Sequence, residues 1–141
     1  MKARLFKSLR HGGDPDAERV YRWHIEERSG HRMRAGLATD KWKRSVEHYL
    51  IAARSLINAM AHEGFRCEFA VPVDPDGEFL DGSHRIACAL ALGLREIAVE
   101  HRPNRVWADA WDEAWFKNHG CPAEDLDRIR RDWQSLHGEA L

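Results

Sequence analysis

The sequence has few of the features that would assign it to a familiar class of protein. It contains three cysteines, Cys67, Cys88 and Cys121, and their odd number, wide spacing and lack of a CxxC pair argue against a disulfide framework or a zinc ribbon. No apolar stretch has the length of a signal peptide or a bilayer span. No HxxxH or HExxH pair, Walker A loop, dinucleotide fingerprint or GxSxG elbow occurs. These absences predict a protein of the reducing cytoplasm that is neither secreted nor inserted in a membrane.

A surplus of basic charge is also missing. The 22 Lys and Arg residues face 23 Asp and Glu residues, so no positive field over the whole chain would attract nucleic acid. Hydrophobic residues make up 43% of the 141 residues, which is enough for one globular domain with its own core. We therefore expect a single domain over residues 1–141 whose partners are small molecules, and a homodimer is compatible with the sequence.

Two patterns compete between residues 14 and 29. Tyr21, Trp23 and Ile25 alternate with polar residues as in a strand, whereas Asp14-Pro15 is a good start for a helix. We favour the helix, because five side chains would then share one face: Ala17, Val20, Tyr21, His24 and Ile25.

A clearer helix follows, which Thr39 or Asp40 can cap and which Gly64 ends. Six apolar residues recur at helical spacing within it: Val46, Tyr49, Leu50, Ala53, Ile57 and Met60. Three cations, Lys41, Lys43 and Arg44, would lie at its start, where the helix dipole disfavours positive charge. An anionic substrate or nucleotide could compensate them, and so could the neighbouring carboxylates Asp40 and Glu47.

The rest of the chain alternates short strands with helices. The predicted elements are strands at 67–73, 78–80 and 96–101 and helices at 84–92, 106–118 and 123–137. A turn with Pro and Gly, residues 74–77, separates the first two strands. In the C-terminal helices, two sets are assigned to packing: Trp107, Trp111 and Trp115, and Leu126, Ile129, Trp133 and Leu136.

The residues that best indicate chemistry are the consecutive Asp81, Gly82, Ser83, His84 and Arg85. A glycine between a strand and a helix lets the backbone approach a ligand, and the first helical amides carry positive partial charge. Hydroxyl, imidazole and guanidinium groups add donors for an oxyanion. The alternative is that Asp81 or Ser83 only caps the helix while Arg85 pairs with a surface carboxylate.

The segment DGEFLDGSHRIACALALG, residues 76–93, resembles the signature of the ParB/sulfiredoxin fold, and a looser similarity extends from about 41 to 102. The resemblance implies an α+β fold, with a small mixed sheet and packed helices in a core at 41–102. A helical extension at 14–38 and a C-terminal helical pair at 106–137 would flank this core. It also implies that Gly82, Ser83, His84 and Arg85 bind nucleotide phosphates.

The branches of this fold differ in activity. Sulfiredoxins carry a catalytic cysteine where this chain has Ser83, and a hydroxyl cannot replace a thiolate in reducing a sulfinic acid. Chromosome-partition ParB proteins carry an Arg-Arg pair and a following DNA-binding domain, and they bind CTP. The free serine kinases, with Asp-Gly-x-His-Arg, resemble this chain most. The resemblance therefore implies a kinase that uses ATP or ADP, or another nucleoside phosphate, with Mg²⁺ to phosphorylate a hydroxyl of a small polar metabolite.

Within such a kinase, Asp81 would contact Mg²⁺ or accept the proton of the substrate, because an acid beside phosphates needs a cation or a proton. Glu26, or else Glu27, would supply the second catalytic acid, and the alternative is that both are solvated helix charges. Two other functions remain open. One is a non-catalytic ParB-like module that acts in nucleotide-dependent regulation or in association with DNA, and the other is a site that binds a phosphorylated metabolite without turnover.

Overall fold

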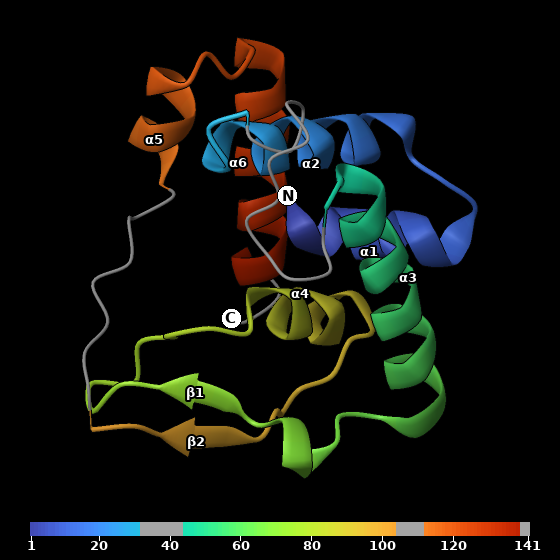
Figure 1. Ribbon diagram of the computed structural model, residues 1–141, viewed down its shortest axis with the longest axis vertical. Coiled ribbons are helices and arrows are strands. Elements are labelled where there is room, and N and C mark those ends of the chain that lie inside the picture. The colour runs from blue at the N-terminus through green and yellow to red at the C-terminus, as the bar shows by residue number, and fades with distance from the viewer. Residues whose placement is uncertain (32–43, 104–111, 139–141) are drawn as a thin grey trace. The chain divides into compact units, whose positions relative to one another are not determined.

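The structure, a computed structural model, describes residues 1–31, 44–103 and 112–138 (Figure 1). The chain divides into two compact units, Lys2–Trp107 and a smaller one formed by Ala108–Leu141 with Met1. The single domain over 1–141 stays a prediction. Among the described helices, none combines the length and the apolar character needed to cross a bilayer.

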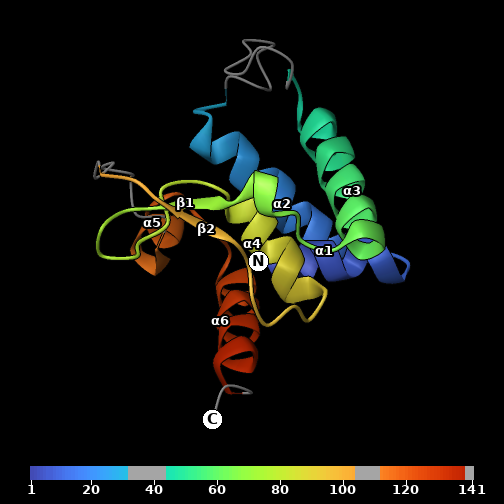
Figure 2. The same ribbon diagram turned by 90° about the horizontal axis from the view of Figure 1, so that it is seen from below.

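Four helices form most of the larger unit: α1 (Lys2–His11), α2 (Pro15–Arg28), α3 (Val46–Glu63) and α4 (Ser83–Ala91). Helix α4 packs against α1 and α3, and α1 also packs against α2 and α3 (Figures 1 and 2). The five largest fully buried side chains come from these helices: Leu5, Phe6, Tyr21, Ile25 and Ile57. Helix α1 lies where the sequence analysis predicted no element.

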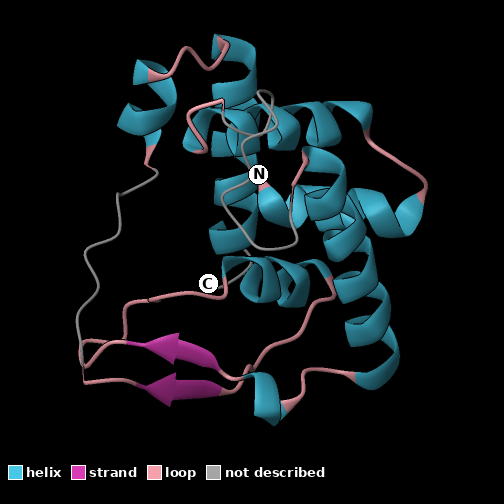
Figure 3. Ribbon diagram, in the orientation of Figure 1, coloured by secondary structure: helices cyan, strands magenta, loops and turns pink. Residues whose placement is uncertain are grey.

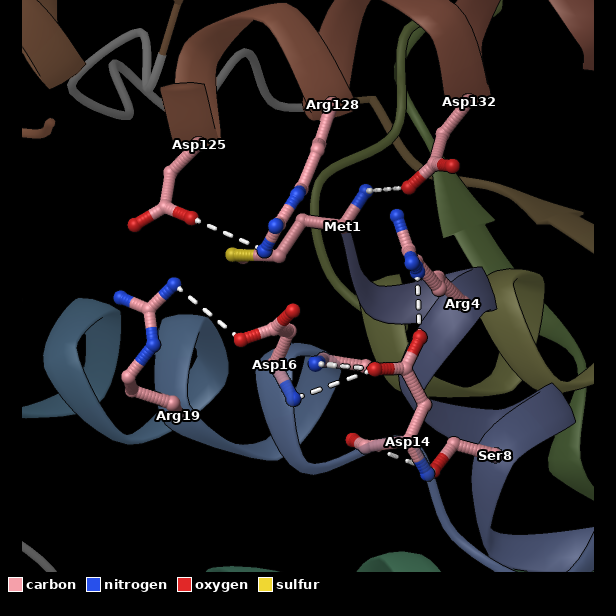
Figure 4. A network of polar contacts seen from close by, with 10 residues as sticks. Met1, Arg4, Ser8, Asp14, Asp16, Arg19, Asp125, Arg128 and Asp132 are labelled. Carbon is pink, nitrogen blue, oxygen red and sulfur yellow. Dashed lines mark hydrogen bonds and ion pairs between the residues drawn. The ribbon is translucent and has the colours of Figure 1, made fainter. Parts of the chain in front are cut away.

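The prediction of a helix after residue 14 is confirmed by α2, whose buried residues are the five predicted to share a face. Asp14 caps this helix, and its carboxylate accepts hydrogen bonds from the amides of Asp16 and Ala17 (Figure 4). Arg4 Nε lies 2.7 Å from the same carboxylate, and Ser8 Oγ accepts from the Asp14 amide. Asp14 therefore both starts α2 and ties it to α1.

Helix α3 is confirmed through Glu63 and buries the six predicted apolar residues, but its predicted start is wrong. Ser45, with extended backbone, is the cap, and its hydroxyl accepts from the amide of His48. Arg44 consequently precedes the helix, exposed, rather than lying in its first turn. The other predicted caps and cations, Thr39, Asp40, Lys41 and Lys43, lie outside the described residues.

Two three-residue strands, β1 (Val71–Val73) and β2 (Val99–His101), pair in parallel with Val71 opposite Val99 (Figure 3). The predicted strands were too long. The first four residues of 67–73 precede β1 and include a 3₁₀ turn, η1 (Cys67–Phe69), and 96–98 lie before β2. The predicted strand 78–80 is reduced to one antiparallel bridge between Phe79 and Val73, which the amides of Leu80 and Asp74 support by donating to the carbonyls of Pro72 and Glu78.

The described residues are thus rich in helix with a small two-stranded sheet, which is compatible with the predicted α+β class. The helix predicted at 84–92 is confirmed by α4, which is followed by Gly93 at a φ of 71°. The assignment of the fold to the ParB/sulfiredoxin type stays a prediction.

The smaller unit contains α5 (Glu113–Asn118) and α6 (Ala123–Gly138). The predicted helix at 106–118 is confirmed over Glu113–Asn118, but Asp112 is extended and caps α5 by accepting from the Trp115 amide at 2.8 Å, so the helix does not run through residue 112. The preceding part, 106–111, lies outside the described residues. Helix α6 is confirmed, and Leu126 is buried, but Trp133 is 63% exposed rather than packed. Trp107 and Trp111, like the side chain of Leu136, lie outside the described residues.

Candidate functional site

The turn before α4 is built on Gly82. This residue is buried and adopts the left-handed conformation, with a φ of 88°. A Cβ at this position would lie 3.1 Å from Nη2 of Arg85 and 3.2 Å from both methyl carbons of Val71. The turn therefore requires glycine for two reasons, its positive φ and the close approach of β1.

Helix α4 begins at Ser83, and its first internal hydrogen bond runs from the Ile86 amide to the Gly82 carbonyl at 3.0 Å. The amides of residues 83–85 precede that bond, so they have no partner within the helix and carry its positive partial charge. The cap position belongs to Gly82, which has no side chain, so neither Asp81 nor Ser83 occupies it. This geometry suits an anion at the start of α4.

Lys2 reaches this helix start from α1. Its Nζ donates a hydrogen bond of 2.6 Å to Oγ of Ser83. Burial lowers the pKa of the Lys2 ammonium to about 8, and the positive charge of Arg28 lowers it further while Asp81 opposes the shift. The site thus contains a partly desolvated cation that the sequence analysis missed, because the contact joins residues 81 positions apart.

His84 is held in place by contacts from α2 and α1. Its Nε2 lies 2.7 Å from the hydroxyl of Tyr21, and the rings of Tyr21 and Phe6 both meet it edge-on. Burial raises the pKa of Tyr21, so the phenol stays protonated and can donate to a neutral imidazole or accept from a protonated one. The ring of His84 is therefore fixed in orientation before any ligand binds.

Positive charge gathers around the buried His24. Burial lowers the pKa of this imidazole to about 3, and Lys2, Arg28 and His84 lower it as well by their charge. The guanidinium of Arg28 lies 5.4 Å from the centre of the Tyr49 ring. We call Lys2, Arg28 and His84 the basic cluster; its members come from three different helices, and each acts electrostatically on His24.

Arg85 makes two backbone contacts that the sequence did not indicate, and it lies near a surface carboxylate, as the alternative prediction had it. Its Nη1 donates to the carbonyls of Phe69 and Ala70, at 2.5 and 2.8 Å, and its Nη2 lies 3.9 Å from Asp81. The Asp81 side chain is itself 82% exposed. Arg85 therefore ties α4 to the segment that enters β1, while its predicted contact with a phosphate stays a prediction.

The structure brings no second acid to the turn among the residues it describes. Glu26 lies on α2 with its side chain partly exposed, and no described hydrogen bond or ion pair joins it to residues 81–85. Glu27 lies 3.2 Å from His31 one turn further along the chain. The described part of the chain also holds no cluster of three or more side chains that could bind a metal. Asp81 adjoins the turn in the sequence, and its carboxylate lies 3.9 Å from Nη2 of Arg85.

A small pocket of about 120 Å³ lies beside His84, between it and α3. Its wall is formed by Tyr49, Ala52, Ala53 and Leu56, so the site offers room next to the imidazole for only a small group.

Comparison with known proteins gives no relative. No protein-family model, no curated protein and no solved structure matches the chain. The assignment of function therefore depends on the chemistry of residues 81–85 and their neighbours.

Proposed function

We propose that the start of α4 binds the phosphates of a nucleotide, and that the protein is a phosphotransferase that uses ATP or ADP with Mg²⁺. Its acceptor would be a hydroxyl of a small polar metabolite. The observation that carries the proposal is the Lys2 ammonium, which lies 2.6 Å from Ser83 Oγ at the first residue of α4. A lysine brought from a distant helix to a helix N-terminus adds a full positive charge to an end that already favours anions.

Phosphoryl transfer needs mainly positioning of the reactants and neutralisation of charge, with few covalent roles for the protein. In this proposal the amides of residues 83–85 and the Ser83 hydroxyl hold phosphate oxygens, and Lys2 and His84 neutralise them. Arg85 would contact the phosphate through Nη2, because its Nη1 already donates to the backbone carbonyls of residues 69 and 70. Nη1 itself could contact the phosphate only after giving up one of these carbonyls.

Asp81 would provide the protein ligand for Mg²⁺. Magnesium in kinases is typically held by one or two carboxylates together with the phosphates of the substrate, so it does not require a preformed cluster of acids. The exposed carboxylate of Asp81, next to the glycine of the turn, fits this requirement. We retain Glu26 as the second catalytic acid on the resemblance to the serine kinases, and Arg44 as a weaker substrate contact together with Lys41 and Lys43.

Calorimetry with ATP, ADP and CTP in the presence of Mg²⁺ tests the proposal first, and a screen of small hydroxyl compounds for ADP formation follows. Asp81→Asn should abolish turnover and keep most nucleotide affinity, whereas Ser83→Ala should weaken nucleotide binding. If no nucleotide binds, the proposal is wrong. Nucleotide-dependent retention of DNA without phosphoryl transfer would instead support the ParB-like regulatory module.

A further inference from the structure

An apolar pocket of about 260 Å³ lies between the C-terminal half of α3 and the segment that leads into β1. Ala59 and Met60 line it from α3, Phe65 and Phe69 from the following segment, and Arg85 from α4. The described charges at its rim are already paired, since Arg66 Nη1 lies 3.1 Å from Glu63. The pocket is therefore suited to a flat, largely apolar group rather than to a charged one.

Arg85 connects this pocket to the proposed phosphate site. It is the third residue of α4, so it lies two residues, or roughly 3 Å of helical rise, beyond Ser83. Its side chain forms part of the pocket wall while its Nη1 bonds to the carbonyls of Phe69 and Ala70. Measured along the axis of α4, the pocket wall thus begins less than one helical turn from Ser83. The Ser83 and Arg85 side chains leave the helix in different directions, so the pocket and the phosphate site are joined at the end of the helix and not by contact between these two side chains.

The pocket also presents an aromatic face. Phe69 is 55% exposed although it lines an apolar wall, and the guanidinium of Arg66 lies 5.4 Å from the centre of its ring. Exposed phenyl rings and arginine planes are the surfaces on which nucleobases stack, because every base has a π-face. A stacked base would cover the ring of Phe69, and the carboxylate of Glu63 at the rim could accept a hydrogen bond from an exocyclic amine.

We propose that this pocket holds the base of the nucleoside triphosphate whose phosphates bind at the start of α4. The inference rests on the proposed function, and it adds that the protein recognises a nucleoside and not only an anion. Phe69 is then a stacking residue, and Arg85 connects the base pocket to the phosphate site by holding the pocket wall through the carbonyls of residues 69 and 70.

The test compares inorganic tripolyphosphate with ATP, GTP, CTP and UTP, all with Mg²⁺, by calorimetry on the full chain. At least one nucleotide should bind about ten-fold more tightly than tripolyphosphate, since stacking on one aromatic side chain is worth about 1–3 kcal/mol per base. Phe69→Ala should remove most of this advantage and leave the affinity for tripolyphosphate unchanged. Phe79→Ala is the matched control, because Phe79 is also 55% exposed but does not line the pocket.

A second variant fills the pocket and leaves Phe69 in place. Ala59 is exposed on α3 and lines the pocket, so Ala59→Trp should fill it and likewise abolish the nucleotide advantage, whereas Asn58→Trp on the same helix should not. If every nucleotide binds no more tightly than tripolyphosphate, the base pocket is wrong and the phosphate site stands. If the advantage survives both Phe69→Ala and Ala59→Trp, the base lies elsewhere. If neither tripolyphosphate nor any nucleotide binds, the proposed function itself fails, and the pocket inference fails with it.

Discussion

The two sides of α4 are held in different ways. On the side of α1 and α2, which we call the helix side, Phe6 and Tyr21 are fully buried and both contact the ring of His84. Lys2 adds a hydrogen bond to Ser83 from the same side. The helix side therefore depends on the volume and polar ends of large side chains.

On the strand side of α4, the contacts are mainly to backbone. Val71 of β1 lies against Gly82, and Arg85 bonds to two carbonyls before β1. All three residues of the neighbouring strand β2 are exposed, and Val99 is 46% exposed. On the helix side, α4 is therefore held by the packing of large buried side chains. On the strand side, it is held by the close approach of Val71 to Gly82, which has no Cβ, and by the hydrogen bonds of the Arg85 guanidinium.

The largest expected effect comes from Phe6→Ala on the helix side. Removing a fully buried phenyl ring leaves a cavity and should lower the free energy of unfolding by about 3–5 kcal/mol. Phe79→Ala, at a residue that is 55% exposed, should cost less than about 1 kcal/mol. Urea unfolding of the two variants measures the difference, and equal losses would contradict the conclusion that packing of buried side chains holds the helix side.

Gly82→Ala tests the strand side and should cost about 2–3 kcal/mol, because a positive φ and a close contact with Val71 both oppose a Cβ. Gly77→Ala is a close control, since its φ of 86° is almost the same but no atom lies within 4 Å of a Cβ there. It should lose only about 1 kcal/mol from backbone strain. Similar losses in the two variants would show that the approach of β1 to Gly82 does not matter.

The same contrast explains which parts of the fold could be predicted. The periodicity of α2 is local, so the sequence alone identified its five buried residues. Strands of three residues show too little alternation of polar and apolar residues to define where they begin, so both were predicted too long. Helix α1 was missed because its ten residues offer no acidic first turn and follow no recognised cap.

The candidate site was predictable only in part, for a similar reason. Residues 81–85 are consecutive, so their combination of glycine and donors is visible in the sequence. Their partners are not, because Lys2 and Tyr21 lie 81 and 63 positions away from the residues they contact. Tertiary packing decides these pairings, and a single sequence contains no periodic signal of them.

The pH dependence of stability tests the basic cluster on the helix side. The His24 imidazole has a pKa lowered to about 3 from an ordinary value of 6.5, so the unfolded chain binds more protons between these two pH values. The free energy of unfolding should therefore fall by roughly 1 kcal/mol when the pH is lowered from 6.5 to 5.5. Urea unfolding of His24→Gln across this range should show a correspondingly smaller fall, and an unchanged one would mean that His24 is not the group responsible.

Lys2→Met should have the smallest effect on stability and a clear effect on binding. Methionine keeps the length and apolar stem of the side chain, and it removes a charge that burial already disfavours, so unfolding should change by less than about 1 kcal/mol. Affinity for tripolyphosphate should fall about ten-fold, because an anion at Ser83 loses its nearest cation. Lys7→Met, at an exposed residue of the same helix, is the control and should leave that affinity unchanged.

Proton uptake distinguishes a direct role of Lys2 from a loss of packing. At pH 8 the Lys2 amine, with its pKa lowered to about 8, is close to half protonated, and a bound anion would raise that pKa. Tripolyphosphate binding to the unmodified protein should then take up as much as about half a proton, measured as the difference in binding enthalpy between buffers of different ionisation enthalpy. Lys2→Met should lose this uptake and Lys7→Met should keep it. Equal uptake in both variants would mean that the bound anion does not raise the pKa of Lys2, and the direct role of Lys2 would be wrong.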